Sequence, residues 1–139
     1  MDTKKFLTGT LAGGFAFFFV GYLIYGMAMV GFFTEHIAAC ASRPMEEIVW
    51  WALILGNVSS GALLTYIFLK WANVSSFGGG LSAAAAIGFF MALSMNLLRF
   101  STSNMIDLTG ALTDVVAATV LAAVSGGVIG AVLGMGRKS

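Results

Sequence analysis

The chain has 139 residues, of which 59% are hydrophobic and only 9% are charged, and its mean hydropathy is +0.95. This composition excludes an ordinary soluble domain, because too few charged side chains remain to cover its surface. The net charge of +1, without a run of Lys and Arg residues, excludes nucleic acid as a partner. Cys40 is the single cysteine, so no disulfide can form within one chain.

Four apolar segments follow one another along the chain, at residues 6–33, 48–69, 79–98 and 115–135. Each reaches the roughly 20 residues that an α-helix needs to cross a hydrocarbon layer about 30 Å thick. They lack the alternating polarity of barrel strands, and a spanning segment must satisfy its own backbone hydrogen bonds. The sequence therefore predicts an all-α integral membrane protein, a four-helix bundle formed by a single transmembrane domain over residues 1–139.

Basic residues near the segment ends predict the orientation, because Lys and Arg accumulate in cytoplasmic loops. Arg43 and Arg99 fall on one side of a chain with four spans. Five basic residues fall on the other side: Lys4, Lys5, Lys70, Arg137 and Lys138. Both termini are therefore expected on the cytoplasmic side of a bacterial inner (plasma) membrane, in a multi-pass protein.

The loop after the first segment contains Glu35, His36 and Cys40, which are residue types that can bind metals. Their spacing matches no known metal motif, and no second cluster completes a site. A catalytic triad needs a histidine with an acidic partner and a nucleophile, and His36 is the single histidine. The sequence thus predicts no catalytic residue, no metal and no cofactor, and the protein is not expected to be an enzyme.

The second segment contains an amide at a depth where a bilayer offers no polar partner. Asn57 lies nine residues after Ile48, which is about 13 Å into the membrane by helical rise. Tyr22 of the first segment and Ser125 of the fourth fall at a similar depth. We expect a midplane polar cluster of these three residues that holds helices together, with a substrate or ion site as the alternative.

Small residues recur every four positions on the third and fourth segments. The third segment has Gly80, Ala84, Gly88, Ala92 and Asn96, and the fourth has Gly110, Asp114, Ala118, Ala122, Gly126, Gly130 and Gly134. Such ridges allow two helix backbones to approach closely, and close packing drives much of helix association in lipid. We expect the ridges to pack the bundle internally; the alternative is a face for a homo-oligomer or another protein.

Arg99 and Asp114 lie at one level, where the third and fourth segments leave the apolar layer. A charge at an interface avoids most of the roughly 2.5 to 3.5 kcal/mol that it would cost at a helix centre. We therefore expect a structural ion pair between them, with an ion or proton site as the alternative. Asn104, followed three residues later by Asp107, is typical of an N-cap for the fourth helix.

One resemblance to a known family rests on three features. They are Gly21-Tyr22-Leu23-Ile24-Tyr25, the Gly-rich start of the third segment, and Asp114 at the head of the fourth. In these the chain resembles the small four-helix bacterial membrane proteins catalogued as a domain of unknown function. That family implies no activity. Small multidrug transporters are similar in size, but this chain lacks the glutamate that they use in their first helix.

These observations predict a non-catalytic accessory or scaffold subunit that packs against other membrane helices. Its expected partners are the lipid bilayer and either further copies of itself or other membrane subunits. The alternative is a small oligomeric transporter or channel with a polar site near Asn57 or near Arg99 and Asp114.

Overall fold

The computed structural model describes residues 3–28, 31–32, 35, 49–103 and 106–135. The bounds of the helices are α1 (Thr3–Gly21) with the π-helical segment η1 (Tyr22–Ala28), α3 (Trp50–Ile67) with the π-helical segment η4 (Phe68–Ala72), α4 (Phe77–Thr102) and α5 (Leu108–Met135). Within the described residues, these make four helices long and apolar enough to cross a membrane. The prediction of an all-helical chain with four apolar helices is therefore confirmed for this part of the chain.

The hairpin between α4 and α5 extends beyond the apolar spans expected from the sequence. α5 begins at Leu108 rather than near Val115. The Asp107 carboxylate accepts the backbone N–H of Gly110 at 2.7 Å, which satisfies one of the unpaired donors at the helix start. Asp107 is thus an N-cap of α5, and the cap expected at Asn104 lies outside the described residues.

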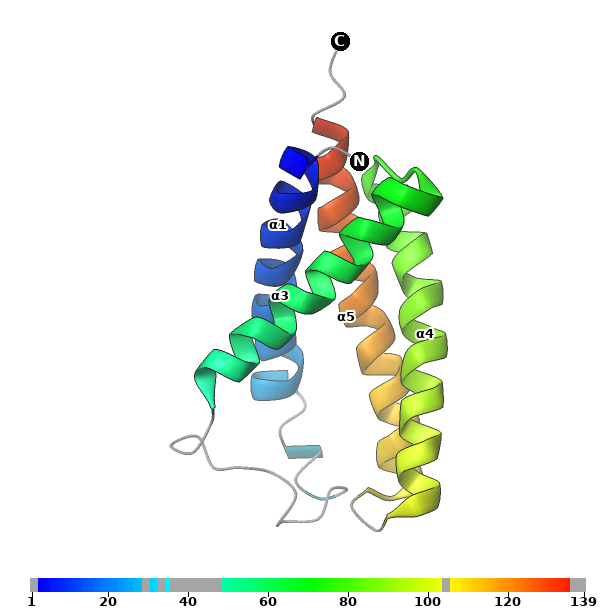
Figure 1. Ribbon diagram of the computed structural model, residues 1–139. Coiled ribbons are helices and arrows are strands. Elements are labelled where there is room, and N and C mark those ends of the chain that lie inside the picture. Colours follow the sequence, from blue (N-terminus) through cyan, green and yellow to red (C-terminus); the bar gives the residue numbers. More distant parts are fainter. Residues whose placement is uncertain (1–2, 29–30, 33–34, 36–48, 104–105, 136–139) are drawn as a thin grey trace.

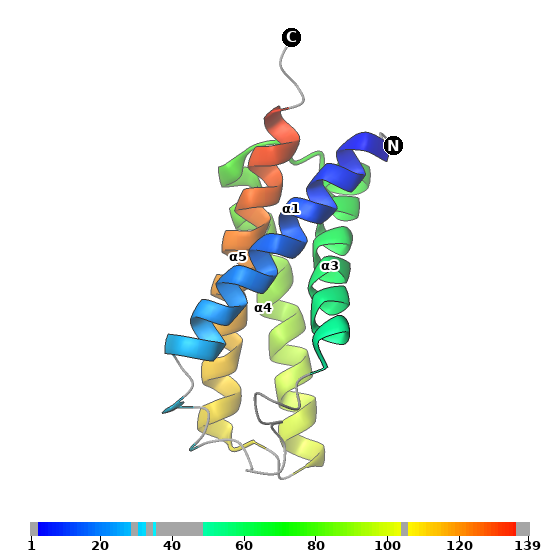
Figure 2. The ribbon, with the colours of Figure 1, turned by 90° about the vertical axis from the view of Figure 1, so that its left-hand side faces the viewer.

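Neighbouring helices follow one another in the order α3, α1, α5, α4. α4 packs along α5, while α1 packs against both α3 and α5. α1 begins and α5 ends at the same end of the bundle (Figures 1 and 2). α3 crosses the bundle obliquely, so it approaches α4 near η4 and diverges from it toward Trp50 (Figure 1). The end near η4, where α3 approaches α4, is called the closed end of the bundle, and the end near Trp50, where the two helices diverge, is called the open end.

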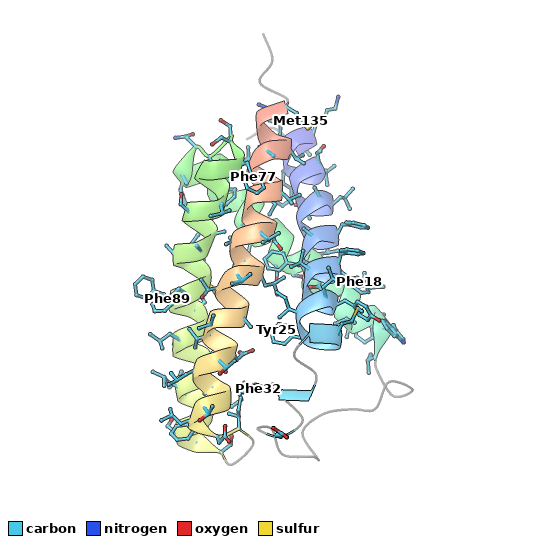
Figure 3. The ribbon with its side chains drawn as sticks, turned by 180° about the vertical axis from the view of Figure 1, so that it is seen from behind. Phe18, Tyr25, Phe32, Phe77, Phe89 and Met135 are labelled. Atoms are coloured by element: carbon cyan, nitrogen blue, oxygen red, sulfur yellow. The ribbon has the colours of Figure 1, made fainter. Side chains whose placement is uncertain are left out.

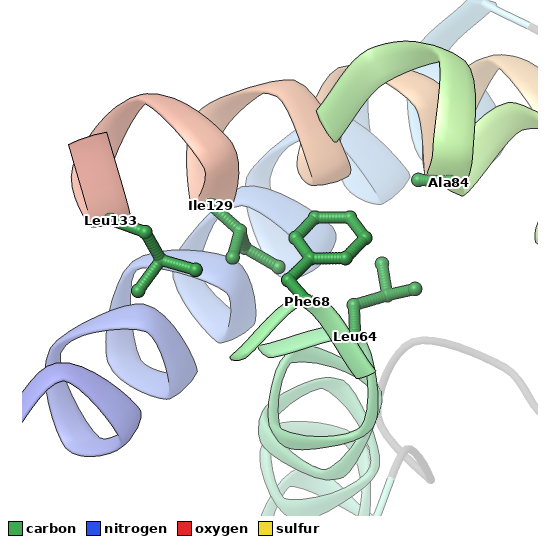
Figure 4. Close-up of a cluster of buried hydrophobic side chains, with 5 residues drawn as sticks. All are labelled: Leu64, Phe68, Ala84, Ile129 and Leu133. Carbon is green, nitrogen blue, oxygen red and sulfur yellow. The ribbon is translucent and has the colours of Figure 1, made fainter. Parts of the chain in front are cut away.

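A cluster of buried apolar side chains lies at the closed end of the bundle (Figure 4). Its members come from α3, η4, α4 and α5 and are Leu64, Phe68, Ala84, Ile129 and Leu133. The side chains of Phe68 and Ile129 are fully buried. Because the cluster joins three of the four spanning helices here, it fixes the place where α3 crosses the bundle.

Small residues also set the contact between α1 and α3. A Cβ atom added to Gly61 would lie 2.6 Å from the backbone nitrogen of Gly14 and 2.8 Å from the carbonyl oxygen of Thr10. Side chains do not tolerate such distances, so the two backbones can meet only because residue 61 is glycine. In lipid this close approach replaces the hydrophobic driving force that helix packing has in water.

The two ridges of small residues face each other between α4 and α5, and the contact between them is called the seam. The neighbouring positions are Gly80 with Gly126 and Gly130, Ala84 with Gly126, and Gly88 with Ala122. Continuing this register by four residues places Ala92 opposite Ala118 and then Asn96 opposite Asp114. At the other end, Gly130 and Gly134 lie against the backbone of Ser76 and Ser75. These ridge positions thus pack against each other within one chain. The end of the seam at Asn96 and Asp114 is polar.

Candidate functional site

Asp114 is the polar centre at the open end of the bundle. It lies half-buried in the second turn of α5. The hydroxyl of Tyr25 donates to its Oδ1 at 2.8 Å, and the Nδ2 group of Asn96 donates to its Oδ2 at 2.7 Å. Figure 3 shows Tyr25 between η1 and α5. Each carboxylate oxygen therefore accepts a hydrogen bond from a different helix.

Asn96 links Asp114 to Arg99. The Arg99 guanidinium donates from Nη2 to the Asn96 Oδ1 atom at 2.8 Å. The Asn96 side chain is only 3% exposed, and its Nδ2 also lies 2.9 Å from the carbonyl oxygen of Ala92. Tyr25, Asp114, Asn96 and Arg99 thus form one chain of side-chain hydrogen bonds, named below the polar network.

The polar network corrects the ion pair expected between Arg99 and Asp114. Among the described residues, no direct salt bridge joins these two side chains, because Asn96 lies between them. The seam explains this arrangement: Asn96 occupies the ridge position opposite Asp114, and Arg99 follows three residues later on α4. An uncharged amide therefore donates to the carboxylate with one end and accepts from the guanidinium with the other.

The polar network joins three elements of the bundle through one carboxylate. Asp114 is the only carboxylate within the four long apolar helices that the structure describes. Both of its oxygens accept hydrogen bonds from residues of other elements, Tyr25 and Asn96, which ties η1, α4 and α5 together. Among the described residues, no group of three or more His, Cys, Asp or Glu side chains could hold a metal ion.

The expected midplane cluster of Tyr22, Asn57 and Ser125 is not formed by hydrogen bonds. The Asn57 Nδ2 group donates to the carbonyl oxygen of Leu53 at 2.8 Å, one turn earlier on its own helix. Tyr22 is 50% exposed, whereas Ser125 is fully buried and its hydroxyl has no hydrogen-bond partner in the structure. Similar depth in the membrane was thus insufficient to predict hydrogen bonds between these residues, because the Asn57 amide donates to its own helix rather than to another helix.

A groove of about 350 Å³ lies between α3 and α4. Asn57, Ser60 and Leu63 line it on α3, and Met91 and Met95 line it on α4. Its floor includes residues of α1 and α5. The Ser60 hydroxyl donates to the carbonyl oxygen of Gly56 at 3.2 Å. Since both polar side chains on α3 are bonded to their own helix, the groove offers mainly an apolar surface.

Sequence reasoning identified the two charged members of the polar network, Arg99 and Asp114, but missed Tyr25 as a partner and treated Asn96 only as a ridge residue. A signal was available for both. Asn96 and Asp114 interrupt the two ridges of small residues at matching positions. A polar residue at the same step of two facing ridges predicts a hydrogen bond between them. Tyr25 had no comparable signal, because the contact depends on where η1 ends beside α5.

Comparison with known proteins provides no relative from which a role could be transferred. No protein-family model, no curated protein and no solved structure matches this chain.

Proposed function

We propose that this protein is a non-catalytic subunit of a bacterial inner membrane, with both termini in the cytoplasm, that packs against helices of other membrane proteins. The main support is the uneven burial of its helices. In the most apolar stretch of α5, 44% of the residues are buried inside the chain, compared with 11% in α4. α3 and α4 stand at the two ends of the helix order and leave their outer faces uncovered.

The exposed surface of α4 is made of large side chains. Phe90 is 68% exposed, and its ring meets that of Phe89 edge to face at a centroid distance of 5.3 Å. Figure 3 shows Phe89 projecting away from the bundle. Large aromatic side chains contribute much of the contact energy at protein interfaces. A partner helix with small residues would accept them closely.

Internal use of the ridges argues against a homo-oligomer built on small residues. Gly80, Gly88 and Gly126 already lie against the opposing helix of the same chain. A second copy could not reach these positions without separating α4 from α5. We therefore place the partner on the outer face of α4 and favour a different protein over a second copy.

Native mass spectrometry of the protein extracted from its own membrane tests this proposal. We expect heterologous membrane proteins to accompany the wild-type chain. The variant Phe90→Ala should lose them, because it shortens the most exposed aromatic side chain on α4. Phe15→Ala is the matched control, since Phe15 on α1 is 71% exposed and belongs to another face. A homo-oligomer retained equally in both variants would contradict the proposal.

The alternative function is a small transporter or channel, and one observation favours it: Asp114 is a carboxylate within an apolar helix. Such groups often mark ion or proton paths. Asp114→Asn removes the titratable group with little change in size. If the variant folds normally and loses an ion flux that the wild-type protein shows in liposomes, the transport function is correct and the scaffold is not.

A further inference from the structure

We propose that the groove between α3 and α4 binds one acyl chain of an anionic phospholipid, with the lipid phosphate held by Arg99. This site is separate from the outer face of α4, on which the partner protein is placed. The inference rests on the shape of the groove, the chemistry of its walls and the charge at its open end.

The divergence of α3 from α4 creates the groove and leaves one end of it open. Figure 1 shows the two helices meeting near η4 and separating toward Trp50. The lining residues run from Leu64, beside the closed end, to Asn57 and Met95. In a bilayer this space must be filled, because empty space beside apolar side chains forfeits dispersion contacts.

The volume of the groove suits a narrow ligand. The groove offers about 350 Å³, which lies within the roughly 300 to 1,000 Å³ typical of small-molecule sites. A narrow, flexible acyl chain can therefore enter it.

The walls suit hydrocarbon. Leu63, Met91 and Met95 present apolar side chains, and methionine adapts its shape to irregular neighbours. Asn57 and Ser60 also line the groove, but each donates to a carbonyl oxygen of its own helix. An acyl chain requires no hydrogen bond from these walls, whereas a polar solute would compete with both existing bonds.

Arg99 provides charge complementarity for the headgroup. It follows Met95 by four residues on α4, so it lies one turn beyond the open end on the same side of the helix. It is exposed, and it donates to Asn96 rather than directly to Asp114. A guanidinium has five N–H donors and suits the geometry of a phosphate.

The test is a lipid titration of the delipidated protein followed by native mass spectrometry. Phosphatidylglycerol is compared with phosphatidylcholine of the same chain length. Ser60→Leu fills the groove and should weaken binding of both lipids about tenfold. Ser59→Leu, on the exposed neighbouring position outside the groove, is the matched control and should leave both affinities unchanged.

The headgroup contact is tested by a second pair of variants. Arg99→Gln keeps a donor for Asn96 but removes the charge. It should reduce the affinity for phosphatidylglycerol on the order of tenfold, the loss expected from one charge-assisted hydrogen bond, and reduce that for phosphatidylcholine less, because the choline cation already offsets the charge of the same phosphate. Lys70→Gln makes the same change of charge at the other end of the bundle and should preserve the preference.

A phosphatidylglycerol with a photoactivatable acyl chain tests the wild-type protein directly, so the proposal remains testable if a variant fails to fold. Adducts are expected on residues 57–64 and 87–95. Adducts confined to other helix faces would overturn the proposal. So would equal lipid affinity in Ser60→Leu and Ser59→Leu, no preference for the anionic lipid in the wild-type protein, or a dimer that Ser60→Leu dissociates, which would make a second copy the occupant.

Discussion

Asn96 connects two charges of opposite sign without direct contact between them. Its amide donates to Asp114 and its carbonyl oxygen accepts from Arg99, at 2.7 and 2.8 Å. Asn can perform both roles because its side chain contains donors and an acceptor. An apolar residue at this position would leave both charges without a partner on α4, and unpaired charges are expensive in an apolar layer. The polar network is thus expected to be most sensitive to substitution at Asn96.

Tyr25 offers the cleanest test of the polar network at the scale of single residues. Tyr25→Phe removes only the hydroxyl that donates to Asp114. We expect a loss of stability of about 1 to 3 kcal/mol, because the acceptor is charged and half-buried. Thermal unfolding in detergent measures it. Tyr22→Phe is the matched control: it makes the same change in η1, on a side chain that is 50% exposed, and should have little effect.

A double-mutant cycle shows whether the members of the polar network act as a unit. Tyr25→Phe and Asn96→Leu remove the two donors to Asp114. Their combined effect should differ from the sum of the single effects by more than about 0.5 kcal/mol, because both act on one carboxylate. Strict additivity would mean that the two donors act independently rather than as a unit. Equal loss of stability from Tyr25→Phe and Tyr22→Phe would mean that the hydrogen bond from Tyr25 does not stabilise the bundle.

Among the helices, the closest contacts depend on a few glycines whose neighbours are backbone atoms. At Gly126 an added Cβ would meet the Ala84 side chain and the carbonyl oxygen of Gly80. Backbone atoms cannot rotate away as side chains do, so α4 and α5 would have to separate. At Gly56 on α3 an added Cβ would meet nothing within 4 Å. Replacing glycine by alanine should therefore lower the stability at Gly126 but not at Gly56.

We expect Gly126→Ala to lower the thermal stability in detergent by about 1 to 3 kcal/mol, as overpacking does in a close-packed interior. Gly56→Ala should leave stability unchanged or raise it, because alanine favours the helix over glycine by up to about 1 kcal/mol. The comparison of the two melting profiles is the measurement. Equal profiles would show that the seam between α4 and α5 tolerates separation, and that the packing inferred from the ridges is wrong.

The sequence predicted the helices and the residues of the seam far better than their spatial order. Length and apolarity were sufficient to predict four helices, and the spacing of Gly80, Ala84 and Gly126 marked the surfaces that now face each other. The oblique path of α3 was not predictable. Its first turns are apolar on every side, so no pattern distinguishes a face toward α4 from a face toward lipid. The groove depends on that path and was missed for the same reason.

At the scale of the whole molecule, the order of the helices separates the two surfaces for which functions are proposed. α5 contacts both α1 and α4, whereas α3 and α4 have exposed outer faces and line the groove. The polar network lies at the open end, where it joins η1, α4 and α5 while α3 diverges. The proposed lipid site therefore lies beside a part of the bundle that hydrogen bonds hold together.

The last prediction concerns the orientation of the whole molecule in its membrane. α1 begins and α5 ends at one end of the bundle, and η1 ends and α3 begins at the other (Figure 1). Cys40 lies in the chain between η1 and α3 and is the single thiol. If both termini are cytoplasmic, a membrane-impermeant thiol reagent should label Cys40 in intact cells. A Cys40→Ala, Ser139→Cys double variant should be labelled only in inverted vesicles. The opposite pattern would place Arg99 and the polar network at the cytoplasmic surface, contrary to the distribution of basic residues.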